Sequence, residues 1–160
     1  MSQSDRYYGK YRGVVTSNED PNNLGRIKAQ VPAVSDSEMG WATPSTPYAG
    51  NGVGMFFIPP VGANVWIEYE GGDLELPIWS GCFWDEGEAP ADSPDIKIIK
   101  TDFATININD ASGAGEITIE SITGVKIVLG SDGIELSYNA AKIKLTAASV
   151  NINDGAFEVI

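Results

Sequence analysis

The 160-residue sequence carries 22 Asp and Glu against 10 Lys and Arg, and its formal net charge is −12. A phosphate backbone is bound through clustered Lys and Arg side chains, so we expect no nucleic-acid partner. The sequence contains no histidine, which excludes His-dependent acid–base catalysis and His metal ligands. We predict a protein that is not an enzyme, with no catalytic residues, no metal site and no cofactor.

The N-terminus gives no sign of export by the general secretory route. Its first ten residues, MSQSDRYYGK, contain no apolar segment, and no stretch of the chain has the roughly 18 apolar residues of a membrane span. We therefore expect no signal peptide and assembly in the cytoplasm. The single cysteine, Cys82, lies in the strand-like segment SGCFW, and we expect it to be a small buried residue.

Residues 1–87 are rich in aromatic residues, Gly and Pro, and we predict that they form one domain. Short alternating segments indicate strands, and no long segment has the 3.6-residue period of a helix. About five short strands of this kind suit an OB-fold barrel. The predicted strands are Tyr11–Ser17, Arg26–Val31, Gly54–Ile58, Asn64–Glu70 and Ile78–Trp84.

Residues 88–96, EAPADSPDI, have the composition of a linker, and residues 97–160 form a second region. Within it, residues 97–124 hold two loosely spaced transition strands, predicted at Phe103–Asn109 and Glu116–Ile122. Residues 125–160 then repeat a tighter pattern, in which a pair of apolar residues spaced two apart recurs every seven to nine residues. The pattern predicts a stack of strands joined by tight turns.

Each repeat of the tail has one apolar face, and a single stack of such strands is too narrow to bury that face. Closing three chains into a prism would bury it on a common axis and would pair the strand edges with other chains. A β-solenoid made by one chain is the alternative. The predicted trimer core consists of Ile127, Leu129, Ile134, Leu136, Ile143, Leu145, Val150 and Ile152.

Other motifs have plain structural interpretations. The Gly-rich segment 50–54 precedes no helix, and the bend at 110–116 lacks the ligand spacing of an EF-hand, so both are interpreted as turns. Glu68 and Glu70 should share the solvated face of one strand. Because OB barrels often bind oligosaccharides, a carbohydrate-binding or adhesive β-protein remains the second hypothesis. Its candidate residues are Trp41, Trp66, Trp79 and Trp84.

Two segments of residues 1–87 resemble the OB-fold domain of contractile injection spikes, the group of phage baseplate protein V and the valine-glycine repeat (VgrG-type) proteins of type VI secretion. The first segment is LGRIKAQVP, residues 24–32, and the second extends from Ile58 to Gly81. They occur in the family's order and precede the expected tail. The positions that match the family motif are Gly25, Arg26, Pro32, Gly62, Gly72, Asp73, Pro77 and Gly81.

The resemblance implies a homotrimer in which three OB barrels form a collar and three tails wind into an intertwined triple-stranded β-helix. The collar would bind a baseplate hub protein. When a sheath contracts, the needle would be driven outward through a target envelope, with transient contact with the target membrane. The implied function is that of a non-enzymatic central spike in a phage tail-like particle or a type VI-like system.

The chain departs from some members of that family. No lysozyme-like insertion fits within residues 88–96, and the histidines that hold iron at the apex of several phage spikes are absent. The tail instead stops at an apolar end. Three copies would leave Phe157, Val159 and Ile160 as a platform, which we expect to carry a separate PAAR-type tip protein.

Overall fold

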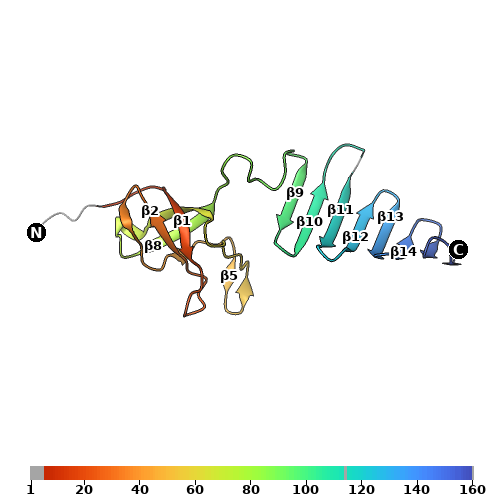
Figure 1. Cartoon of the computed structure of the whole chain (residues 1–160), viewed down its shortest axis with the longest axis horizontal. Coiled ribbons are helices and arrows are strands. Elements are labelled where there is room, and N and C mark those ends of the chain that lie inside the picture. Colours follow the sequence, from red (N-terminus) through yellow and green to blue (C-terminus); the bar gives the residue numbers. More distant parts are fainter. Residues whose placement is uncertain (1–5, 114, 160) are drawn as a thin grey trace, which may run out of the picture. The chain divides into compact units, whose positions relative to one another are not determined.

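The computed structural model describes residues 6–113 and 115–159, and the chain divides between Glu88 and Ala89 into two compact units (Figure 1). Both units are built from strands. In the described residues the one helical element is a 3-10 turn, Glu70–Gly72. The all-β prediction is therefore confirmed.

The first unit is a six-stranded sheet in the order β3-β2-β1-β7-β8-β4. An isolated bridge between Ile27 and Ala42 joins the residues that precede β2 and β4, and so closes the sheet into a barrel. A separate hairpin of β5 and β6 lies away from the barrel strands in Figure 1. The strands are β1 (Tyr11–Ser17), β2 (Lys28–Val31), β3 (Ser35–Glu38), β4 (Thr43–Pro44), β5 (Ala49–Gly50), β6 (Val53–Gly54), β7 (Asn64–Tyr69) and β8 (Pro77–Cys82).

Strict alternation builds the core of the barrel. In β7, Val65, Ile67 and Tyr69 are buried and the residues between them are only partly covered, as a period of two requires. Aligned positions on β1, β2 and β8 complete the core. Its buried members are Val15, Ile27, Ala29, Val31, Ala42, Val65, Ile67, Tyr69 and Trp79.

The structure corrects three details of the predicted barrel. Strand β6 covers only Val53–Gly54, so residues 55–58 are extended chain without a strand partner. Strands β3, β4 and β5 were not predicted, because none of them has an apolar alternating pattern. Cys82 is exposed rather than buried, since the alternation that turns Pro77 and Trp79 inward on β8 turns Cys82 outward.

The second unit is an eight-stranded antiparallel meander in which every strand pairs with its neighbours in the sequence (Figure 1). Its first strand, β9, was not predicted and begins where the predicted linker ends. The strands are β9 (Ile96–Lys100), β10 (Ala104–Asn109), β11 (Glu116–Ser121), β12 (Val125–Gly130), β13 (Gly133–Tyr138), β14 (Ala141–Leu145), β15 (Val150–Ile152) and β16 (Phe157–Val159).

Candidate functional site

One face of the tail sheet carries two continuous columns of apolar side chains. The antiparallel register sets apolar residues directly opposite one another on successive strands, so they share a face. The first column has one member on each of the eight strands: Ile99, Ile106, Ile119, Ile127, Leu136, Ile143, Ile152 and Phe157. The second column consists of Ile108, Ile117, Leu129, Ile134, Leu145, Val150 and Val159.

Within the tail unit, the described residues of this face remain partly open to solvent. Ile143, in the middle of β14, is 46% exposed, and Leu145, at the end of the same strand, is 47% exposed. Ordinary soluble domains rarely leave a contiguous apolar surface of this extent uncovered. The face is therefore a surface that requires a partner.

The eight residues predicted as a trimer core all lie in these two columns. The columns also extend through β9, β10 and β11, which the sequence pattern indicated only as transition strands. Phe157 and Val159, predicted as a platform at the end of the tail, are the last members of the two columns. The third platform residue, Ile160, lies outside the described residues.

The opposite face of the tail is polar and carries charges of both signs. Glu120 lies opposite Lys126 in the register, and Glu135 lies opposite Lys144. Lys142 lies 3.2 Å from Asp154, whose hydrogen bond raises the pKa of the lysine ammonium above its ordinary value. Cross-strand pairs of opposite charge suit a face that remains in water.

Within the described chain, β10 to β15 have both edges hydrogen-bonded to neighbouring strands of the same chain. Only β9 and β16 have a free edge. We expected other chains to pair the strand edges. The pairing inside the chain leaves the apolar face, rather than the edges of the inner strands, as the main surface available to other copies.

One charged pair sits at the first layer of the apolar face. Lys97 lies opposite Ile108 in the register, at the position where the second column would begin. Its ammonium nitrogen lies 2.6 Å from Oδ2 of Asp110. The pair therefore ends the second column at β9, where the first column still has Ile99.

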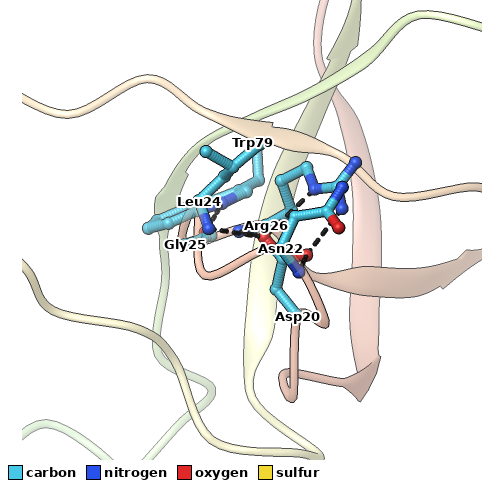
Figure 2. Close-up of polar contacts among 6 residues, drawn as sticks. All are labelled: Asp20, Asn22, Leu24, Gly25, Arg26 and Trp79. Carbon is cyan, nitrogen blue, oxygen red and sulfur yellow. Dashed lines mark hydrogen bonds and ion pairs between the residues drawn. The ribbon is translucent and has the colours of Figure 1, made fainter.

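In the barrel, a buried carboxylate organises the loop between β1 and β2 (Figure 2). The Asp20 side chain is only 3% exposed. It accepts hydrogen bonds from the backbone amides of Asn22 and Leu24 at 3.0 and 2.8 Å. The Arg26 side chain donates two more, from Nε at 3.1 Å and from Nη2 at 2.6 Å. The arginine hydrogen bonds, and then those of the backbone amides, hold the pKa of Asp20 far below its ordinary range.

The same loop is joined to the barrel core through Gly25. The indole Nε1 of buried Trp79 donates to the Gly25 carbonyl at 3.1 Å (Figure 2). Gly25 has a φ of +73°, and a Cβ there would lie 3.1 Å from Ile58 and 3.2 Å from Phe56. Only glycine combines this conformation with such close packing.

Gly25 and Arg26 of the family motif thus act together with Asp20, which the motif positions did not include. The sequence feature that could have identified Asp20 is Asp-Pro-Asn at residues 20–22. It is typical of a turn in which the aspartate accepts backbone hydrogen bonds.

The remaining motif residues shape turns around the barrel. Gly62 donates its backbone N–H to the Val15 carbonyl at 2.9 Å, and the Gly72 carbonyl accepts from Tyr7 at 3.0 Å. Asp73 accepts from the backbone N–H of Glu75 at 3.1 Å. The others lie at the ends of strands: Pro32 follows β2, Pro77 begins β8 as a buried residue, and Gly81 lies near the end of β8.

The four tryptophans do not share one surface. Trp79 is buried in the core, and Trp84 is exposed beyond β8. The Trp66 ring contacts the Phe83 ring at a tilt of 42°, with 4.8 Å between centroids, and the Arg12 guanidinium lies 5.2 Å from the Trp66 centroid. Trp41 lies near the cationic groups of Arg26 and Lys28. The structure therefore gives no support to a common stacking platform for sugars.

Nor do the two glutamates form a paired acid site. Glu70 begins the 3-10 turn rather than continuing β7. A hydrogen bond with Ser80, and then one with Lys10, lowers the pKa of Glu68, whereas a general acid needs a raised pKa.

Among residues 6–113 and 115–159, no three His, Cys, Asp or Glu side chains gather as a metal site. No helix in that part of the chain is long and apolar enough to span a membrane.

Two domain families match the chain, one for each unit. Residues 11–84 match the type VI secretion system/phage-baseplate injector OB domain. Residues 96–158 match the phage baseplate V C-terminal trimerisation domain. The chain belongs to the phage baseplate V family. No curated protein matches it.

The two matches explain the two sites described above. The baseplate V protein is a spike-type structural component, and the Asp20 loop is part of the construction of its OB domain. The apolar columns lie in the trimerisation domain, so the chain forms a homotrimer.

Proposed function

We propose that three copies of the chain bury the apolar columns against one another and form the central spike of a contractile injection machine. The observation that supports this proposal is the continuity of the first column across all eight strands of the tail and of the second column from β10 to β16. In this arrangement the three polar faces point outward into water. The trimer core then includes the column members on β9, β10 and β11 as well as the eight predicted residues. These additional members are Ile99, Ile106, Ile108, Ile117 and Ile119.

A continuous apolar core suits a part that transmits force. Each half-exposed Ile or Leu that becomes buried adds about 1 kcal/mol, and the contribution recurs in three chains at every layer. The contacts between chains are spread over all the strands of the tail, so its stiffness does not depend on one pair of side chains. We propose that contraction of the sheath supplies the free energy of penetration and that this chain transmits the force to the target envelope. No catalytic step is part of this function.

We propose that the OB domains form the collar that attaches to a baseplate hub. The particle assembles in the cytoplasm, and contraction delivers the spike outward across the target envelope, with transient contact with the target membrane.

The far end of the tail is proposed to carry a PAAR-type tip protein. Strand β16 offers a free edge, and Phe157 and Val159 are 59% and 53% exposed. A free strand edge beside apolar side chains is a common docking surface for another β-protein.

The attachment of the tip is tested by deleting residues 157–160 and mixing the shortened trimer with a PAAR-type protein. We expect the native mass to remain that of a trimer while binding of the PAAR-type protein is lost. A matched control is Ala156→Ser, which changes an exposed residue of the turn before β16 and leaves the free edge of β16 in place. Undiminished binding by the shortened trimer would contradict the proposed site.

A further inference from the structure

The OB domain carries an apolar arm that its own barrel does not cover. Every residue from 47 to 57 is exposed. Five of these eleven residues have large apolar side chains, and the most exposed, Phe56, is 72% accessible. The five are Tyr48, Val53, Met55, Phe56 and Phe57.

Few interactions within the chain hold this arm. Strands β5 and β6 form only two register pairs, Ala49 with Gly54 and Gly50 with Val53. The hairpin is extended by two hydrogen bonds, from the Met55 amide to the Tyr48 carbonyl at 2.9 Å and from the Thr46 hydroxyl to the Met55 carbonyl at 3.0 Å. A two-stranded hairpin of this size has marginal stability in water on its own.

An open groove of about 750 Å³ lies at the base of the arm. Its barrel side is formed by Leu24, Pro44 and Trp79. The Asp20 hydrogen bonds and the Trp79–Gly25 hydrogen bond fix this wall, since they hold the loop from which Leu24 projects. The arm itself forms the other wall of the groove. Each chain therefore offers both a projecting apolar element and an apolar recess at its base.

We propose that the arm of one chain packs into the groove of the next chain around the trimer, so that the OB domains form a closed ring. A cyclic trimer requires this kind of contact, in which one surface meets a different surface on its neighbour. After closure each arm is covered and each groove is filled. The inference rests on the proposed trimeric spike and assigns a second interface to it.

The tail supplies the proximity that such a contact needs. Residues 83–95 connect β8 to β9 and can span at most about 45 Å when fully extended. Once three tails have associated, each OB domain meets its neighbours at an effective concentration on the order of 1 mM. A contact too weak to join free OB domains is then sufficient.

A second copy accounts for both features better than other occupants do. A small ligand in the groove would leave the outward side chains of the arm exposed. A hub protein would cover the arm only after baseplate assembly, and the free trimer would meanwhile carry three exposed aromatic arms, which favour nonspecific association.

Hydrogen exchange of the full-length chain tests the ring. The wild-type trimer is compared with Ile143→Asp, which places a charge in the first column and is expected to separate the chains. We expect amide exchange in residues 48–57 to be about tenfold slower, or more, in the trimer than in the separated chain. Equal exchange rates in the two samples would overturn the ring.

A pair of variants tests which side chains form the contact. Phe56→Ser combined with Phe57→Ser should restore fast exchange in the arm while the native mass remains that of a trimer. Leu76→Ser is the control, because Leu76 is also half-exposed but lies in the turn before β8. Slow exchange that persists in the double variant would overturn the ring. A wild-type mass of one chain would instead contradict the trimeric spike, so the two failures are distinguishable.

Discussion

Asp20 and Arg26 form an ion pair at 2.6 Å. The Asp20 carboxylate also accepts hydrogen bonds from backbone amides of the loop between the two residues and from the amide of Arg26 itself. The pair therefore fixes the loop as well as neutralising a charge. The sequence spacing of six residues is bridged by a turn whose carbonyl at Gly25 accepts from the core tryptophan. The loop is therefore held both by its own hydrogen bonds to Asp20 and by the hydrogen bond from Trp79 in the barrel core.

The first prediction concerns the acid stability of the barrel. The pKa of Asp20 is lower in the folded chain than in the unfolded chain, so the unfolded chain binds the proton more readily. This stabilisation is fully present above the ordinary aspartate pKa of 3.8 and is lost as pH falls from there through the folded pKa.

We expect Asp20→Asn to lower the unfolding midpoint of the OB domain at pH 7. The difference from wild type should shrink as the pH is lowered toward 2. Thermal unfolding followed by tryptophan fluorescence at several pH values measures it. A difference that stays constant from pH 7 to pH 2 would show that the charge of Asp20 does not stabilise the barrel.

The second prediction concerns the facing of the tail. Ile143 and Lys144 are adjacent in β14 and point to opposite faces of the sheet. Ile143→Asp would bury three carboxylates at one layer of the trimer core and should cost several kcal/mol, on the order of 3 per chain. Lys144→Ser should change the free energy of unfolding by less than about 1 kcal/mol.

Sedimentation of both variants measures the outcome. We expect single chains with a folded OB domain for Ile143→Asp and trimers for Lys144→Ser. The reverse result would mean that the polar face points inward.

The third prediction concerns Lys97 and Asp110 at the β9 end of the columns. If three such pairs meet near the trimer axis, breaking one partner leaves a partly buried charge and should cost about 3 kcal/mol. An exposed pair would contribute less than about 1 kcal/mol. Lys97→Asp should therefore weaken the trimer strongly, and adding Asp110→Lys should restore it. Chemical unfolding of the trimer at several concentrations compares the three proteins, and a weak effect of Lys97→Asp would place the pair outside the core.

The fourth prediction concerns Asn107 on the polar face. Its Oδ1 is buried and has no hydrogen-bond partner in the described residues. Its register partners are Ile98 and Thr118, and a β-branched side chain suits that position. We expect Asn107→Val to stabilise the tail by about 1 kcal/mol, since it removes an unsatisfied polar atom. A loss of stability in thermal unfolding would show that the amide finds a partner in the trimer.

The sequence predicts the tail well because each strand there has the same simple alternation. Ile127 and Leu129, or Ile143 and Leu145, identify the apolar face directly, and the register then follows from tight turns. The continuation of the columns into β9 was less visible, because Lys97 occupies an apolar position and the strand directly follows a proline-rich segment.

The barrel was harder to predict where backbone contacts or distant partners decide the structure. Strand β3, Ser35–Glu38, is exposed at all four residues and is held by pairing with β2 and by Glu38, which accepts hydrogen bonds from Lys28 and Thr16. No hydrophobic pattern marks such a strand. Residues 55–58 have a strand-like composition, yet they belong to no strand. Residues 55–57 are exposed, and only Ile58 packs against the barrel core.

The central claim is that the open apolar face of the tail joins three chains. Light scattering coupled to size exclusion tests it most directly on the full-length protein. We predict a mass three times that of the 17.0 kDa chain, in an elongated particle that persists on dilution. A compact particle with the mass of one chain would contradict the account and would leave the two apolar columns without a partner.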